Sequence, residues 1–198
     1  KVLLLDEPLS ALDTRTTGRL QEELKKMHRL TKTTTIHVTH SFEEAFSLGD
    51  RIAVMKDGKI IQVGVPDDIF RKPNSEFIAD FVGVENLYRG KSVVHNDISE
   101  VHTDEICIVS STLKSGDVSV SIRPEDIFIS KKEFESSARN SFVGKIIRIK
   151  SMGALTKIEV DVGAPFVVAL TKQSFENMGF ACCNRVYIAF KASAGHLF

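Results

Sequence analysis

Two adjacent carboxylates end the first apolar run of the chain and are the residues best placed to do chemistry. Val2–Leu5 predict a buried strand, and Asp6 and Glu7 follow it directly. Open α/β sheets bind ligands at the carboxyl ends of their strands, so both acids are expected at such an edge. In phosphoryl transfer the first acid of such a pair holds Mg²⁺, and the second orients or activates the attacking water. The plain alternative is a strand followed by a solvated acidic turn.

A histidine follows the next predicted strand. Ile36 and Val38 alternate with polar residues, and His40 comes directly after them. Ser41 and Glu44 then have the spacing of a capping box, which predicts that a helix starts here. His40 is therefore expected at a second strand end, where a histidine taken alone is more often packed or solvated than functional.

Together these segments resemble the Walker B, D-loop and switch-histidine regions of ABC-type ATPases. The match consists of VLLLDEP at residues 2–8, SALD at residues 10–13 and VTHSFEEA at residues 38–45. The resemblance implies ATP and Mg²⁺ as cofactors. It implies Asp6 as the Mg²⁺ ligand, Glu7 as the catalytic residue that acts on water, and His40 as a catalytic residue at the γ-phosphate. Asp13 is implied as a further nucleotide-binding residue, although an aspartate there also suits a helix cap.

Two motifs of that family are absent from this sequence. There is no GxxxxGK[ST] loop to hold the phosphates and no LSGGQ-like segment. In the family both precede Walker B. We therefore expect the chain to be the carboxyl-terminal part of a longer ATPase, and we expect it to show no ATP turnover on its own.

Composition excludes several classes of protein. The 198 residues are 42% hydrophobic, enough for one or two cores, and 26 basic residues balance 26 acidic ones, which argues against a nucleic-acid-binding protein. No apolar run approaches the ~18 to 20 residues that span a bilayer, and no signal peptide opens the chain. Three cysteines, including the adjacent Cys182 and Cys183 that are expected on a strand, suit a reducing compartment. The protein is expected at the cytoplasmic face of the cell membrane, where partner subunits would hold it.

The predicted fold class is α/β over residues 1–83, the carboxyl-terminal half of an ATPase domain, followed by an all-β OB-like barrel over residues 84–198. In the first part, apolar spacing predicts a helix from Thr14 to Leu30, and Asp57-Gly58 predicts a hairpin turn. Two short helices are expected between residues 67 and 82. After Gly83, short alternating strands separated by Gly, Ser and Asn predict the barrel.

The second part resembles the barrel extension of importer ATPases and the molybdate-binding Mop-type domain. IRPED at residues 122–126 marks the extension; SARN at residues 137–140, followed by FVGKI, and KAS at residues 191–193 mark the Mop-type domain. Hydroxyl, guanidinium and amide donors suit a tetrahedral dianion. The predicted oxyanion residues, within the motif over 137–198, are Ser137, Arg139, Asn140, Lys191 and Ser193. The resemblance implies molybdate or tungstate as a regulatory ligand. A surface turn with unpaired basic residues is the structural alternative.

These resemblances imply the ATP-hydrolysing subunit of a molybdate or tungstate importer, in which bound oxyanion inhibits transport. The implied partners are a second ATPase subunit, membrane permease subunits and, indirectly, a periplasmic or extracellular oxyanion-binding protein; no nucleic acid is expected. Importers of sulfate, sugars or polyamines remain alternatives, as do a molybdate storage module and a molybdate-sensing regulator. No helix-turn-helix pattern supports the regulator.

Overall fold

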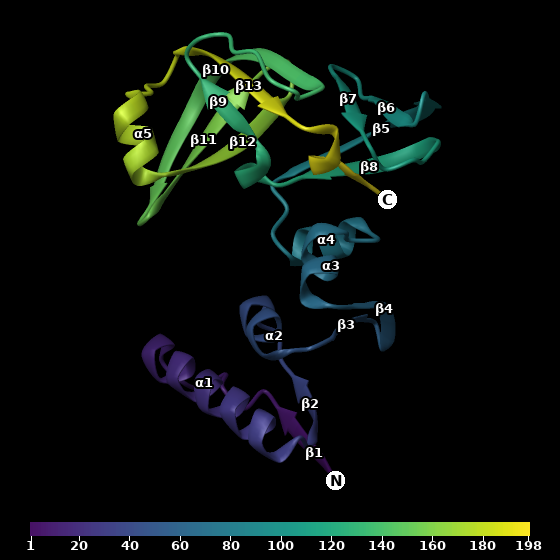
Figure 1. Cartoon of the computed structure of the whole chain (residues 1–198), viewed down its shortest axis with the longest axis vertical. Helices are drawn as coiled ribbons and strands as arrows, with labels where there is room; N and C mark the ends of the chain where they lie inside the picture. The colour runs from purple at the N-terminus through teal and green to yellow at the C-terminus, as the bar shows by residue number, and fades with distance from the viewer. The chain divides into compact units, whose positions relative to one another are not determined.

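A computed structural model describes residues 1–198, which divide into two compact units, Lys1–Lys72 and Pro73–Phe198. The first unit alternates strands and helices, and the second consists mainly of strands (Figure 1). The predicted fold class, α/β followed by an all-β OB-like part, is confirmed. The proposed end of an ATPase part at residue 83 stays a prediction.

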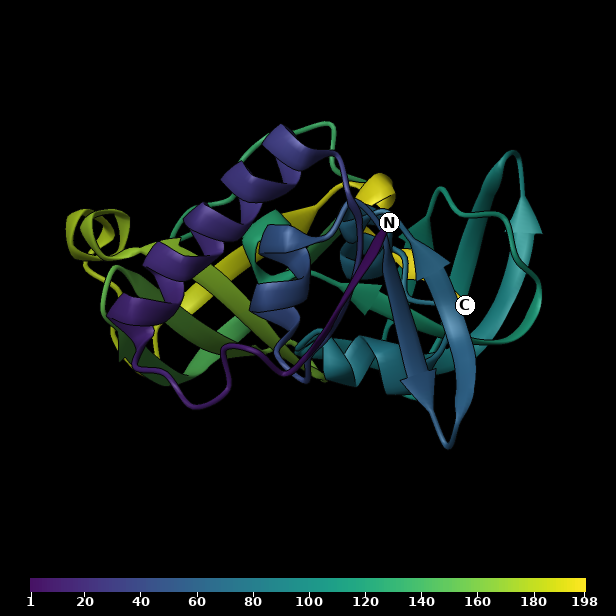
Figure 2. The same ribbon diagram turned by 90° about the horizontal axis from the view of Figure 1, so that it is seen from below.

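The first unit begins with a parallel strand pair and its crossover helix. Strand β1 (Val2–Asp6) is followed by α1 (Thr14–Thr31) and by β2 (Thr34–Val38), which pairs with β1 in parallel. The first unit then continues with α2 (Phe42–Leu48), β3 (Ile52–Lys56), β4 (Lys59–Gly64) and α3 (Pro66–Arg71). Strands β3 and β4 form the predicted hairpin, and Asp57 and Gly58 take positive φ angles of 50° and 74° at its tight turn (Figure 2).

The apolar side chains of β1 and β2 are exposed, which corrects the expectation that β1 is buried. Leu4 is 69% exposed and Ile36 is 54% exposed. The physical reason is that β1 and β2 form a sheet of two strands, whereas a parallel sheet normally has both faces covered.

The second unit has two five-stranded sheets around one core. It opens with α4 (Glu76–Phe81), and one sheet has the order β14-β8-β5-β6-β7, with β5 at Asn86–His95, β6 at Ile98–His102, β7 at Cys107–Ser110 and β8 at Gly116–Ile122. The other sheet has the order β12-β11-β10-β13-β9, with β9 at Phe128–Ser130, β10 at Asn140–Met152, β11 at Leu155–Asp161, β12 at Pro165–Thr171 and β13 at Arg185–Phe190. The remaining elements are η1 (Pro124–Asp126), α5 (Lys172–Met178), η2 (Ala192–Ala194) and β14 (His196–Leu197). Cys182 and Cys183 lie in a turn before β13 and not on a strand, which corrects that expectation.

The second unit contains an internal repeat that the sequence analysis did not identify. NLYRGK at residues 86–91 opens β5, and NSFVGK at residues 140–145 opens β10. Each half also gives its last strand to the other sheet, because β9 pairs with β13 and β14 pairs with β8. The repeated glycine is required by close packing: a Cβ at Gly90 would lie 2.5 Å from the His102 carbonyl oxygen, and one at Gly144 would lie 2.4 Å from that of Asp161. The two halves are thus interlocked copies of one strand pattern.

Candidate functional site

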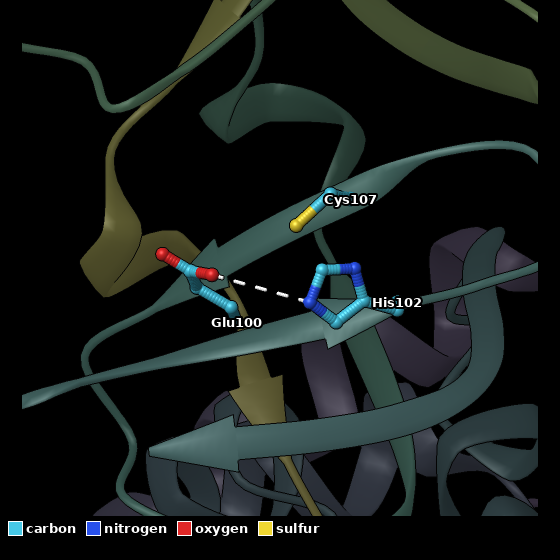
Figure 3. Close-up of side chains that lie close together, drawn as sticks. All are labelled: Glu100, His102 and Cys107. Atoms are coloured by element: carbon cyan, nitrogen blue, oxygen red, sulfur yellow. Dashed lines mark ion pairs between the residues drawn. The ribbon is translucent and has the colours of Figure 1, made fainter. Parts of the chain in front are cut away.

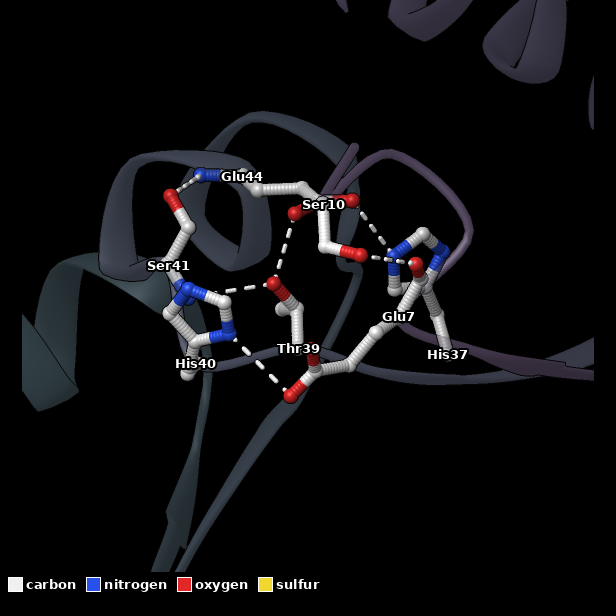
Figure 4. Close-up of polar contacts among 7 residues, drawn as sticks. All are labelled: Glu7, Ser10, His37, Thr39, His40, Ser41 and Glu44. Atoms are coloured by element: carbon white, nitrogen blue, oxygen red, sulfur yellow. Dashed lines mark hydrogen bonds and ion pairs between the residues drawn. The ribbon is translucent and has the colours of Figure 1, made fainter. Parts of the chain in front are cut away.

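The predicted catalytic pair lies at the ends of two adjacent parallel strands. The register pairs Asp6 with Val38, and the Glu7 backbone N–H donates to the Val38 carbonyl at 2.9 Å. This register places Glu7 and His40 at the same edge, and His40 Nδ1 lies 3.1 Å from Glu7 Oε1 (Figure 4). The His40 side chain is 73% exposed and the Glu7 side chain is 45% exposed, so the pair is open to solvent.

The backbone of Glu7 takes a conformation that non-glycine residues seldom adopt. Its φ is +43°, and its carbonyl oxygen accepts hydrogen bonds from the Ser10 backbone N–H at 3.3 Å and from Ser10 Oγ at 2.9 Å. The turn that follows β1 is therefore held by Ser10 of the SALD segment, and the Glu7 carboxylate lies against His40. Departures of this kind cluster at functional sites.

A buried glutamate holds the segment that carries His40. Glu44 is 6% exposed; its carboxylate accepts from Thr39 Oγ1 at 2.6 Å and lies 2.7 Å from His37 Nε2 (Figure 4). Ser41 caps α2 through its hydroxyl, which accepts from the Glu44 backbone N–H at 3.2 Å. The cap is as predicted, but the Glu44 carboxylate binds Thr39 and His37 and does not close a capping box. Sequence reasoning missed this support of His40, for which the only signal was the polar run around the histidine.

The other two predicted nucleotide-site residues differ in their surroundings. Asp6 is exposed at the end of β1, where its carboxylate offers oxygen ligands. Asp13 caps α1, because its carboxylate accepts from the backbone N–H groups of Arg15 and Thr16 and, at 2.6 Å, from Thr16 Oγ1. The hydrogen bond from the Thr16 hydroxyl is the main cause of a lowered pKa of Asp13. Asp13 thus has the helix-cap role that its position also suggested.

Strand pairing brings the two predicted oxyanion segments together. Strand β10 pairs with β13 so that Asn140 lies opposite Phe190. The next residues outward, Arg139 and Lys191, therefore lie at neighbouring strand ends. The predicted donors Ser137, Arg139, Lys191 and Ser193 are all exposed. The register thus brings the SARN and KAS segments, which are far apart in sequence, to one end of the sheet.

Asn140 differs from the other predicted oxyanion residues because it is 2% exposed and pairs with backbone. Its Oδ1 accepts from the Val109 N–H at 2.8 Å, and its Nδ2 donates to the Val109 carbonyl at 2.9 Å. The repeated Asn86 does the same with Val167 at 2.6 and 2.9 Å. Each asparagine joins one sheet to the other, so the structure places Asn140 as a link between sheets.

Replacing Asn140 by alanine is expected to lower the free energy of unfolding by about 1–3 kcal/mol without any anion present. The reason is that the part-buried N–H and C=O of Val109 would lose the Asn140 side chain as a partner. Urea unfolding of the chain measures the change. Ser141→Ala, at the next and exposed position, is the control, and an equal loss of stability in both variants would contradict the assigned role.

Comparisons with known proteins show that the chain is similar to ATP-binding proteins of importers. It is 41% identical over 199 residues to the molybdate/tungstate import ATP-binding protein WtpC of Pyrococcus horikoshii, with 100% of the chain and 56% of that protein covered. It is also 41% identical over 168 residues to the spermidine/putrescine import ATP-binding protein PotA of Trichormus variabilis, with 77% of the chain and 42% of that protein covered. The chain thus spans about half the length of the curated relatives it matches. The predicted resemblance to the ATP-binding subunit of a molybdate/tungstate importer is confirmed.

Two further comparisons are with a family model and with a solved structure. Residues 120–198 match the family model of the TOBE domain. The structure is similar to that of the cytoplasmic molybdate-binding protein ModG with molybdate bound, at a TM-score of 0.51 and 13% identity, over 58% of this chain and 96% of that one. At this identity the similarity establishes the fold alone. No helix of the chain has the length and apolar character needed to span a membrane.

Proposed function

We propose that this chain is part of the ATP-hydrolysing subunit of a molybdate or tungstate importer and carries an oxyanion-sensing domain. The observation that carries the proposal is the Glu7–His40 pair at two neighbouring parallel strand ends, in a chain similar along its whole length to a protein named for that import. A solvated acidic turn would not require the constrained Glu7 backbone or the buried Glu44 support.

In the whole protein, each residue of this edge would have a separate task. Glu7 would orient or activate the attacking water, and His40, held by Glu7, would contact the γ-phosphate. Asp6 would hold Mg²⁺, whose preference for oxygen ligands fits the exposed carboxylate; the ion would neutralise phosphate charge. Asp13 would order the start of α1 near the nucleotide.

The exposed apolar strands support a larger assembly in the whole protein. Further strands and helices would cover the faces of β1 and β2, as parallel sheets require. The assembly would comprise two ATPase subunits on permease subunits at the cytoplasmic face of the membrane, supplied indirectly by an outer oxyanion-binding protein. Bound ATP would close the pair of subunits, and hydrolysis would reopen it.

The neighbouring Arg139 and Lys191 support an oxyanion as regulatory ligand. A compact dianion bound there would trade its hydration shell for charge-assisted hydrogen bonds from two cations and two hydroxyls, and this exchange would favour its binding. A bound oxyanion would hold the two ATPase subunits apart and so inhibit import. The similarity to the polyamine relative makes polyamine import the second candidate function. The two cations would repel a polyamine, which ranks that candidate lower.

ATP-driven uptake tests the proposed function. The whole protein, assembled with its permease subunits in vesicles, is expected to import labelled molybdate only when ATP is present on the side that corresponds to the cytoplasm. Tungstate should compete with molybdate, and spermidine should not. ATP-dependent spermidine uptake without molybdate uptake would reject the proposal in favour of the second candidate.

A further inference from the structure

Three side chains with metal-binding atoms lie on one face of the β6–β7 hairpin. Glu100 and His102 are two residues apart on β6, so they point to the same face, and Cys107 lies directly opposite His102 in the pairing of β6 with β7 (Figure 3). Neither the proposed ATP site nor the oxyanion site uses them.

The opposite face of the hairpin explains why these side chains point outward. Val101 and Ile108, the intervening paired residues, are fully buried in the core. Alternation along each strand therefore fixes Glu100, His102 and Cys107 on the outer face. His102 Nε2 lies 3.9 Å from Glu100 Oε2, and one ligand atom from each of the three residues lies within 4.8 Å of the others.

The turn between the two strands holds this arrangement in place. Thr103 Oγ1 accepts from the backbone N–H of Ile106 at 3.0 Å and donates to the Ile106 carbonyl at 2.9 Å. The Thr103 N–H donates to the same carbonyl at 2.9 Å. His102 and Cys107 thus flank a short, internally bonded loop, which limits the rearrangement that a shared ligand would require.

Cys107 is an exposed free cysteine without the lowered pKa of a reactive thiol. Burial, and then the nearby Glu100 carboxylate, raise the pKa of its thiol, whereas reactive cysteines have lowered values.

We propose that Glu100, His102 and Cys107 bind a divalent transition-metal ion of the zinc class. Thiolate, imidazole and carboxylate are the ligands of Zn²⁺ in proteins, and the presence of sulfur disfavours Mg²⁺ and Ca²⁺. Three protein ligands on a solvent-exposed face leave the fourth position to water or to an anion. Lys91 of β5 lies directly opposite His102 on the same face of the sheet, and it is exposed. The ion would join β6 to β7 and stabilise this edge of the sheet.

Cobalt binding tests the proposal, since a cobalt–thiolate bond gives a strong near-ultraviolet charge-transfer absorption. Cys182 and Cys183 are first both replaced by serine, which removes the two adjacent exposed thiols. This parent variant is expected to bind a single Co²⁺ with that absorption, and Zn²⁺ should displace it. Adding Cys107→Ser should abolish the absorption, and adding His102→Gln should weaken cobalt binding by about 100-fold or more.

Matched substitutions and a second measurement keep the result decisive. His95 is an exposed residue of β5 outside the cluster, and the His95→Gln variant should keep cobalt affinity within about twofold of the parent. In the parent, Zn²⁺ should slow the reaction of Cys107 with a thiol reagent, and the His102→Gln variant should lose this protection. Absence of the charge-transfer band in the parent, its persistence after Cys107→Ser, or unchanged thiol reactivity with Zn²⁺ would overturn the proposal.

Discussion

In the whole protein, Glu7→Gln is expected to lower ATP hydrolysis by about 100-fold or more and to leave ATP binding unchanged. Glutamine keeps the shape of the side chain, and its carbonyl oxygen can still accept the hydrogen bond from His40. It loses the anionic oxygen that would act on water, and positioned acid–base groups typically contribute 10²–10⁴-fold, so the expected loss is about that size. Phosphate release measures turnover, and equilibrium binding of a labelled nucleotide measures the retained affinity.

A control for this prediction is available on the neighbouring helix. Glu43→Gln makes the same carboxylate-to-amide change at an exposed residue of α2. This variant is expected to keep ATP turnover within about twofold of the unmodified protein. If Glu7→Gln turned over ATP as fast as Glu43→Gln, Glu7 would have no catalytic role, and its contact with His40 would be structural only.

The second large effect concerns the oxyanion segments and can be measured on this chain. A ligand that binds only the folded state stabilises it by about 2.7 kcal/mol at about one hundred times its dissociation constant. Molybdate or tungstate is therefore expected to raise the unfolding temperature, and sulfate, a smaller anion, is expected to raise it much less. Arg139→Ala removes a charge-assisted donor; if it weakens binding about 100-fold, only about 0.4 kcal/mol of stabilisation remains at the same concentration.

A cation elsewhere on the same strand distinguishes a site from a general effect of salt. Lys150 lies toward the far end of β10, where it is exposed and pairs with Lys157. The Lys150→Ala variant should therefore keep the full stabilisation by molybdate. Lys191→Ala should behave like Arg139→Ala. Equal, small shifts with molybdate, tungstate and sulfate in all variants would show that ionic strength acts on surface charge, and the oxyanion site would then be rejected without affecting the prediction for Glu7.

Local pattern alone was sufficient for the elements of the first unit and for the strand ends that carry the chemistry. Apolar runs and turn residues predicted β1, β2, the β3–β4 hairpin and the helices after it, because strand alternation, capping and the Asp57-Gly58 turn are short-range properties of the chain. The same signals placed Glu7 and His40 directly after strands. The resemblance to importer ATPases rests on contiguous segments of this kind, and the whole-length similarity confirms it.

Only the tertiary structure decided which of these residues meet and what else they contact. Strand register is a long-range property: it brings Glu7 to His40 and places Arg139 and Lys191 at the ends of two paired strands. Burial separates Asn140, which links two sheets, from its exposed neighbours in SARN, a distinction that donor chemistry by itself does not make. Likewise, Glu44 has the spacing of a capping box, yet its buried carboxylate binds Thr39 and His37. The cluster of Glu100, His102 and Cys107 depends on β6 pairing with β7 in one register, because a shift by one residue would turn Cys107 toward the core.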